Sequence, residues 1–230
     1  VIKIEQIQEK ADFLLNLSNT LDNQVPSKIF DYFCHERPYD IVFNEIAPEE
    51  ALVYEDNAIT VRTVPLKHRI DDVGFIFEEK PKLRHIRRDM VDFHKVPISQ
   101  MKAIKDGEPF IKDDGTVIAN EILTRPADPS IKYAHISDTV YMPELAEKIG
   151  AVDLLFHEST YLSEHEKDAL NRGHSTAAQA AMLARDCGAK KLLLGHYSSR
   201  YKDETLFLKE AQEIFPDSIL NHEGLRIDLD

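Results

Sequence analysis

Two short runs of apolar residues constrain the fold of this chain more than any other feature. Residues 152–156 and 192–194 are apolar over most of their length, which is typical of strands buried on both faces of a parallel sheet. Between them, the alanine-rich residues 175–187 predict a helix that ends at Gly188, because glycine readily adopts the left-handed conformation of a helix cap. A strand, a helix and a second strand in this order predict an α/β fold in which helices cover the sheet.

The same patterns divide the rest of the chain. Residues 11–33 predict two amphipathic helices that are separated near Pro26. Short apolar runs between turn residues predict strands at 41–43, 58–61, 74–77 and 133–136. We also expect helices at 142–149 and 203–214, a small hairpin around the turn at 112–116, a linker at 124–129 and a final hairpin at 218–229.

Composition excludes several classes of protein. Of the 230 residues, 43% are hydrophobic, which is too many for a disordered chain. No apolar run approaches the roughly 18 residues that a membrane-spanning helix requires. Cys34 and Cys187 are too few for a disulfide scaffold or a cysteine-based zinc cluster, and we interpret them as core residues in a reducing compartment. Because the first residue is Val1, we expect that the chain starts late or lacks its true N-terminus.

Positive charge is concentrated in one segment of an otherwise acidic chain. Residues 80–105 contain eight Lys and Arg residues and two Asp residues, so their net charge is 8 − 2 = +6. The whole chain carries −13, so the other 204 residues carry −13 − 6 = −19. General electrostatic binding of nucleic acid is therefore disfavoured, whereas the basic segment could bind a polyanion locally. A solvated helix face with internal ion pairs is the alternative interpretation.

Ionisable residues follow four of the predicted strands. Residues 64–67 lead to His68, and the strands at 133–136, 152–156 and 192–194 lead to Asp138, to His157 with Glu158, and to His196. In α/β proteins the loops at the carboxyl ends of strands form the binding sites, so we expect these side chains to share one site. Two imidazoles with a carboxylate suit zinc, manganese or iron, and a carboxylate between two metal ions could bridge them. For each histidine alone, a structural hydrogen bond is the alternative.

His174 lies just N-terminal to the predicted helix, which Ser175 or Thr176 can cap. The positive end of the helix dipole disfavours a protonated ring and favours a nearby phosphate. A carboxylate such as Glu158 could restore the proton, so that the two side chains together act as a general acid. The alternative is an exposed histidine in a capping segment.

Four motifs occur in a characteristic order and spacing. They are Ser137-Asp138-Thr139, the run DLLFHEST from Asp153 to Thr160, Gly173-His174-Ser175-Thr176, and the run GHYSSRY from Gly195 to Tyr201, preceded by Pro65-Leu66-Lys67-His68 and Gly74-Phe75. Together they resemble the C-terminal two thirds of the ribonuclease Z family, the tRNA 3′-processing endonucleases of the metallo-β-lactamase superfamily. The similarity extends from about His68 to the C-terminus, and residues 1–60 match only loosely.

The resemblance implies an α/β metallo-β-lactamase fold, an αββα sandwich of two sheets flanked by helices, here without its N-terminal portion. Residues 1–230 would form one partial domain, with a basic arm inserted at about 79–117. His68, Asp138 and His196 match metal ligands of the family, with Asp138 as the bridging carboxylate. Glu158 and His174 match the pair that donates a proton to the leaving ribose oxygen.

The resemblance also implies a substrate and partners. The arm matches the segment that, in the family, projects from one subunit and clamps tRNA bound at the other. Its candidate RNA-binding residues are Lys80, Lys82, Arg84, Arg87 and Arg88. Arg200, which follows His196 closely, is a further candidate contact for an RNA phosphate. We expect two zinc ions per subunit of the intact protein, precursor tRNA as substrate, a homodimer, a cytoplasmic location and no contact with a membrane.

Two features depart from the family pattern. The motif His-x-His-x-Asp-His, which supplies three more zinc-binding histidines and the water-activating aspartate, does not occur in this sequence. Each zinc ion would then keep one histidine and the shared Asp138, which is fewer ligands than tetrahedral zinc requires. We therefore expect the chain alone to bind zinc poorly and to cleave little. At the arm tip, residues 96–100 read VPISQ where bacterial relatives often have a Gly-Pro turn.

Three functions are compatible with these observations. The main hypothesis is a zinc-dependent endoribonuclease that removes the 3′ trailer from precursor tRNA and leaves a 3′-hydroxyl on the tRNA. The second hypothesis is a general phosphodiesterase of the same fold that acts on small or cyclic phosphodiesters. The third is a non-catalytic subunit that has lost its metal motif.

Overall fold

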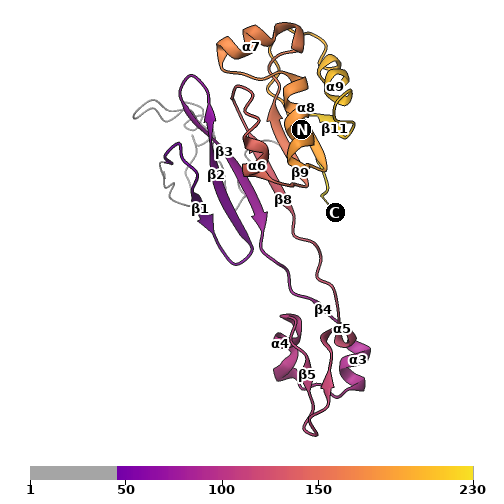
Figure 1. Cartoon of the computed structure of the whole chain (residues 1–230). Coiled ribbons are helices and arrows are strands. Elements are labelled where there is room, and N and C mark those ends of the chain that lie inside the picture. Colours follow the sequence, from indigo (N-terminus) through magenta and orange to yellow (C-terminus); the bar gives the residue numbers. More distant parts are fainter. Residues whose placement is uncertain (1–45, 230) are drawn as a thin grey trace, which may run out of the picture.

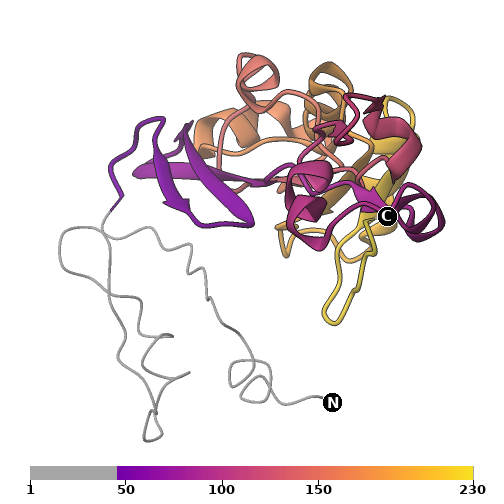
Figure 2. The same cartoon turned by 90° about the horizontal axis from the view of Figure 1, so that it is seen from below.

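The largest element of the structure, a computed structural model that describes residues 46–229, is one mixed sheet of seven strands (Figure 1). Its order is β1-β2-β3-β8-β9-β10-β11. The strands are β1 (Leu52–Glu55), β2 (Ile59–Lys67), β3 (Asp71–Glu79), β8 (Lys132–Ile136), β9 (Leu154–Glu158), β10 (Lys191–Gly195) and β11 (Ser218–Leu220). The pairs from β1 to β8 are antiparallel, and those from β8 to β11 are parallel. Figure 2 shows β1, β2 and β3 at one end of the molecule, away from the C-terminal elements.

The two apolar runs form the centre of the parallel part. In β9 and β10, Leu155 pairs with Leu192, and both side chains are fully buried. The predicted strands at 58–61, 74–77 and 133–136 are also confirmed. Strands β2 and β3 are longer than the patterns indicated, because β2 extends to Lys67 and β3 begins at Asp71. The predicted α/β fold class is therefore confirmed.

Helices cover one face of this sheet. The helices α6 (Leu145–Ile149), α8 (Ala177–Cys187) and α9 (Thr205–Gln212) share its core. The short η2 (Ser163–His165) and α7 (Glu166–Arg172) precede α8 in the chain. Helix α8 begins with a capping box between Thr176 and Gln179 and ends at Gly188, whose φ of 74° is left-handed, as predicted. Its alanines Ala180 and Ala184 are fully buried in the same core cluster as Leu155 of the sheet. Small side chains therefore let α8 pack closely on the sheet.

The opposite face of the sheet carries a row of aromatic rings. Phe77 stacks on Tyr133 at 5.7 Å between ring centroids, and His135 stacks on Phe156 at 4.3 Å. Burial lowers the pKa of His135 to about 4, and the neighbouring His157 adds to the effect. The described residues contain one sheet of this size, so they account for one of the two sheets of the expected sandwich.

A small unit projects from the sheet between β3 and β8, and we call it the arm (Figure 1). It comprises β4 (His85–Ile86), α3 (Arg88–Phe93), η1 (Ile98–Gln100), α4 (Met101–Lys105), β5 (Phe110–Ile111), β6 (Val117–Ile118), α5 (Asn120–Leu123) and β7 (Thr124–Arg125). Strand β4 pairs with β7, so the arm extends beyond residue 117, where the sequence suggested its end. At its base, the backbone N–H of Glu79 donates to the carbonyl of Ile131 at 2.9 Å.

The arm has a hydrophobic core of its own. This buried cluster shares no residue with the core between the large sheet and its helices. It includes Val91, Ile104, Phe110, Ile118 and Leu123. Inside this core, buried Asn120 donates to the carbonyls of Ile104 at 2.7 Å and Glu108 at 2.8 Å. The arm is therefore a folded unit rather than an extended basic loop.

Several expectations are corrected or remain open. The expected hairpin at 112–116 is formed by β5 and β6, whereas the final hairpin at 218–229 is wrong, because β11 pairs in parallel with β10 and no strand follows it up to residue 229. Helix α7 was not predicted. The helices expected within 11–33, the strand at 41–43 and Cys34 lie outside the described residues. Cys187 is a buried free cysteine. In the described part of the chain, no helix could span a membrane.

The separate cores predict that the arm can unfold without the sheet. Leu123 is fully buried, and Leu123→Ala should cost the arm about 2–5 kcal/mol through lost burial and a cavity. Hydrogen exchange followed by mass spectrometry should then show faster exchange across residues 84–125, with β8, β9 and β10 still protected. The control, Val117→Ala, removes a side chain that is 60% exposed and should change little. Equal loss of protection in the sheet would mean that arm and sheet unfold as one unit.

Candidate metal centre

The predicted site residues meet at one edge of the sheet. Asp138 lies two residues after β8, Glu158 is the last residue of β9, and His196 follows β10 directly. Because β8, β9 and β10 are parallel, their carboxyl ends lie at the same edge. His68 follows β2, which ends at this edge because two antiparallel pairings separate it from β8. The shared site expected from four strand ends therefore forms, with one exception.

The exception is His157. Neighbouring residues of a strand point to opposite faces, so the side chain of His157 faces the helices and is fully buried. Its Nδ1–H donates to the carbonyl of Glu158 at 2.6 Å, and burial lowers the pKa of the ring. His157 is a core residue and not part of the site.

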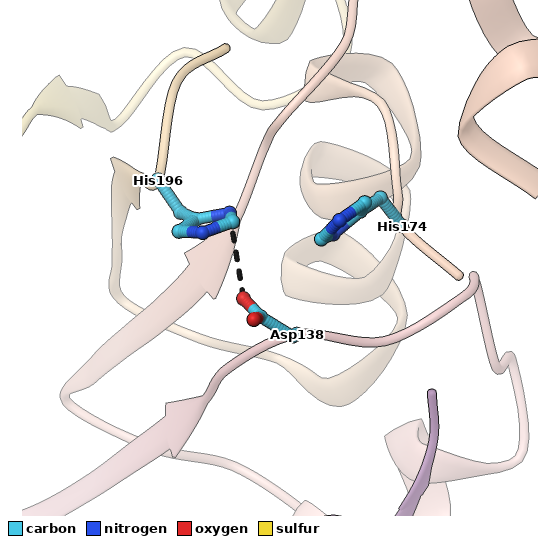
Figure 3. Close-up of side chains that lie close together, drawn as sticks. All are labelled: Asp138, His174 and His196. Atoms are coloured by element: carbon cyan, nitrogen blue, oxygen red, sulfur yellow. Dashed lines mark ion pairs between the residues drawn. The ribbon is translucent and has the colours of Figure 1, made fainter. Parts of the chain in front are cut away.

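Asp138, His174 and His196 form a compact group of possible metal ligands (Figure 3). One ligand atom from each lies within 4.8 Å of the others, and Nδ1 of His196 is 3.4 Å from Oδ1 of Asp138. That carboxylate oxygen is buried and has no hydrogen-bond partner. A buried acceptor without a donor is unfavourable unless a cation or a proton compensates it. Carboxylate oxygens and imidazole nitrogens are donors suited to zinc, so Asp138 and His196 fit a metal ion.

His68 lies beside this group. Its ring centroid is 5.0 Å from that of His174, and the ring of His174 is 5.3 Å from that of His196. The Nδ1–H of His68 donates to the carbonyl of Gly173 at 2.8 Å, which leaves Nε2 with a free lone pair. A Cβ at Gly173 would be 2.8 Å from Nδ1 of His68, and the φ of this residue is +79°, so only glycine suits the position.

The backbone of His196 has an unusual conformation. Its φ is 59°, in the left-handed region that non-glycine residues adopt at a cost of about 1–2 kcal/mol. Such strain persists only where the surrounding structure enforces it, and it is frequent at functional sites. Here it turns the chain immediately after β10 and brings the imidazole to Asp138.

Glu158 is the most densely hydrogen-bonded side chain of the site, and it is fully buried. Its Oε1 accepts from Nδ1 of His174 at 2.9 Å and from the backbone N–H groups of Thr139 and Ser175 at 3.1 Å each. Its Oε2 accepts from the backbone N–H of Thr160 at 3.0 Å and from its hydroxyl at 2.6 Å. Burial alone would raise the pKa of Glu158, but the bonds from His174 and Thr160 outweigh it, and the pKa is lowered.

The pKa of His174 changes in the opposite direction to that of Glu158. Burial alone would lower the pKa of its ring, but the hydrogen bond to Glu158 and the charge of this carboxylate outweigh burial and raise it. The side chain stands two residues before the cap of α8, where the helix dipole would otherwise disfavour a proton. The hydrogen bond to Glu158 thus favours the protonated ring, and the role of this pair as a general acid stays a prediction.

Two neighbours of the site were missed by sequence analysis. Thr160 contacts Glu158 and both histidines His174 and His196 through its hydroxyl. Burial raises the pKa of Asp72 to about 6, and the charge of nearby Asp138 contributes in the same direction. Thr160 could have been found from its place two residues after Glu158, whereas no sequence signal distinguishes Asp72 from the adjacent Asp71.

The candidate RNA-binding cations all have partners within the chain. The ion pairs are Lys80 with Glu55 at 2.6 Å, Lys82 with Glu79 at 2.7 Å, Arg87 with Asp89 at 3.5 Å, Arg88 with Asp92 at 3.2 Å and Arg200 with Asp168 at 3.2 Å. Nε of Arg84 donates to the hydroxyl of Thr124 at 2.8 Å. The guanidinium of Arg200 also lies 5.5 Å from the ring centre of Tyr161, whose ring lies near His174. Arg200 therefore borders the site, whereas the other five residues belong to the arm or its base.

The pairing of Glu158 with His174 makes stability depend on pH. The raised pKa of His174 contributes stability that is complete below its ordinary value of 6.5 and is lost as pH rises through the folded value. The lowered pKa of Glu158 contributes stability that is complete above its ordinary value of 4.5 and is lost as pH falls through the folded value. Both contributions are complete together between about pH 4.5 and 6.5.

Glu158→Gln should lower the pKa of His174, because the charge that outweighs burial is removed. The measurement is an NMR titration of the histidine ring protons in the metal-free protein. In the control, Glu164→Gln, the exposed carboxylate that neighbours His165 is replaced, and the pKa of His174 should not change. An unchanged pKa in Glu158→Gln would show that another group protonates His174.

Comparison with known proteins identifies the family of the chain. Residues 23–197 match the sequence family described as Beta-lactamase superfamily domain. The chain is 47% identical over 202 residues to a protein of Bacteroides fragilis strain YCH46 named ribonuclease Z, covering 87% of this chain and 66% of that protein. It is 43% identical over 204 residues to the ribonuclease Z of Porphyromonas gingivalis strain W83, covering 88% of this chain and 67% of that protein.

The chain also resembles a solved structure, the short form of human tRNase Z, at 21% identity and a TM-score of 0.46, over 79% of this chain and 47% of that chain. The chain spans about two thirds of the length of the curated relatives that it matches. With the match to the superfamily domain and the identity to these relatives, the chain belongs to the ribonuclease Z family of the metallo-β-lactamase superfamily.

Proposed function

We propose that the protein represented by this chain is a zinc-dependent endoribonuclease that removes the 3′ trailer from precursor tRNA and leaves a 3′-hydroxyl on the tRNA. The observation that carries the proposal is the group of Asp138, His174 and His196, supported by buried Glu158, in a chain of the ribonuclease Z family. The family resemblance extends the proposal to two zinc ions per subunit, a homodimer and a cytoplasmic location.

Asp138 and His196 are the residues that would hold the metal ion, with His68 beside them as the third candidate. When bound, zinc would supply a Lewis acid that polarises the phosphoryl oxygens. His174 has a different role in the proposal. A protonated imidazole has no free lone pair, and the bond with Glu158 favours the protonated ring. We therefore assign His174 to proton transfer.

The proton would leave from Nε2 of His174. Because Nδ1 donates to Glu158 at 2.9 Å, Nε2 is the ring nitrogen that remains for the substrate. When water attacks the phosphorus and the bond from phosphorus to the 3′-oxygen breaks, donation of this proton to the leaving ribose oxygen would produce the 3′-hydroxyl of the tRNA, and the phosphate would remain on the trailer. The buried carboxylate of Glu158 would hold the ring in place during the transfer. The nearby guanidinium of Arg200 would contact an RNA phosphate, which could replace Asp168 as its partner.

The arm favours tRNA over a small phosphodiester as substrate. It is a folded unit that projects away from the site, and a small diester would have no use for it. Lys80, Lys82, Arg84, Arg87 and Arg88 are its proposed RNA contacts. Except for Arg84, they form ion pairs whose side chains are partly or largely exposed. Such pairs contribute only about 0–1 kcal/mol, so a phosphate can displace the carboxylates.

Removing the proton donor tests the proposed chemistry. In the full-length protein, His174→Ala should lower the rate of precursor tRNA cleavage by roughly 10²–10⁴-fold, with RNA binding nearly unchanged. The control, His222→Ala, removes an exposed histidine outside the site and should leave the rate unchanged. Rates come from single-turnover assays and binding from filter retention. Loss of RNA binding in His174→Ala would contradict the assignment as proton donor.

Removing the arm tests the substrate. The contact between Glu79 and Ile131 joins the two ends of the arm, so residues 82–128 can be replaced by a short Gly-Ser linker. The variant should lose precursor tRNA cleavage and retain turnover of a small chromogenic phosphodiester. Undiminished cleavage of precursor tRNA would favour a general phosphodiesterase. Full-length protein that binds no zinc would favour a non-catalytic subunit.

A further inference from the structure

Thr160 connects the proposed proton donor pair to a proposed metal ligand. It lies two residues after the end of β9, and its side chain is buried. Its hydroxyl oxygen is 2.6 Å from Oε2 of Glu158, 2.8 Å from Nδ1 of His196 and 3.3 Å from Nδ1 of His174. One hydroxyl group therefore lies at hydrogen-bond distance from three ionisable side chains.

The number of protons determines the direction of these bonds. The hydroxyl has one hydrogen and can accept at its lone pairs. The carboxylate of Glu158 accepts only, and 2.6 Å is the usual length of a bond from a hydroxyl to a carboxylate, so the hydrogen is donated to Glu158. Thr160 must then accept from His196, and Nδ1 of His196 must carry a hydrogen.

The other neighbours do not offer an equally good arrangement. Nδ1 of His174 is closer to Glu158, at 2.9 Å, than to Thr160, so its hydrogen is used there. Oδ1 of Asp138 is 3.4 Å from Nδ1 of His196 and forms no hydrogen bond. Among the described residues, Thr160 is thus the acceptor that orients the ring of His196.

We propose that Thr160 is a positioning residue that holds His196 as the tautomer with hydrogen on Nδ1 and thereby presents the lone pair of Nε2 to the metal ion. The inference rests on the proposed function, because it takes His196 as a metal ligand. The bonds form a continuous path from the Glu158 carboxylate through one hydroxyl to the imidazole. Second hydrogen bonds of this kind fix the orientation of ligating histidines and raise their basicity.

His196 needs such support more than its neighbours do. Its side chain is 49% exposed, so little packing restrains the ring. His68, by comparison, is held by the carbonyl of Gly173, and His174 by Glu158. Each of the three histidines therefore has a defined partner for Nδ1, and for His196 this partner is Thr160.

The first experiment determines the tautomer directly. In metal-free full-length protein above pH 8, long-range ¹H–¹⁵N NMR spectra should show the hydrogen of His196 on Nδ1. Thr160→Ser keeps the hydroxyl and should give the same spectrum. Thr160→Val keeps the shape and removes the hydroxyl, so the tautomer should shift toward hydrogen on Nε2. A wild-type spectrum with hydrogen on Nε2 would overturn the proposal, whether or not the valine variant folds.

The second experiment measures zinc affinity by competition with a chelator. Thr160→Val should bind zinc roughly 10–100-fold more weakly, and Thr160→Ser should remain within a few-fold of the wild type. Equal affinity in the wild type and in a folded Thr160→Val would show that the hydroxyl does not support the ligand. Both readouts are independent of RNA cleavage. If precursor tRNA is not cleaved but the tautomer and affinity behave as expected, only the proposed function fails.

Discussion

The buried carboxylate of Glu158 is the interaction on which the geometry of the site depends. It accepts five hydrogen bonds, from the loop after β8 at Thr139, from the turn after β9 at Thr160, and from the segment before α8 at His174 and Ser175. A buried carboxylate is stable only when donors surround it. Its position therefore fixes three segments that are distant in sequence, and each of them carries or adjoins a proposed functional residue.

The sheet explains how these segments come together. In the register of the parallel strands, Ile136 pairs with His157 and Glu158 pairs with Gly195, so the three strands end at the same level. At Gly195 a Cβ would be 2.5 Å from the ring of Phe156, so the strand before His196 requires glycine to pair this closely. Gly195 therefore lies between the aromatic face and the site, and it leaves no room for a side chain there.

Sequence analysis predicted the parts of the fold that local chemistry determines. The apolar runs of β9 and β10 and the cap at Gly188 depend on a few neighbouring residues, so their patterns were sufficient. For the start of α8 the pattern left Ser175 and Thr176 open, and the structure has Thr176. The strand ends also indicated where Asp138, Glu158 and His196 would lie. The bonds of Thr160 and the burial of Asp72 depend on contacts between distant segments, which no periodic pattern encodes. The parallel pairing of β11 was missed for the same reason.

The arm shows why charge counting alone could not define an interface. Over residues 80–117 the chain has nine Lys and Arg residues and six Asp and Glu residues, so the net charge is 9 − 6 = +3, half of the value over residues 80–105. The added acidic residues lie on the approach to β5 and in the turn between β5 and β6, whereas α4 exposes Lys102 and Lys105. No carboxylate within residues 46–229 forms an ion pair with either lysine. Lys102 and Lys105 of α4 are therefore cations that a polyanion could contact without displacing a carboxylate.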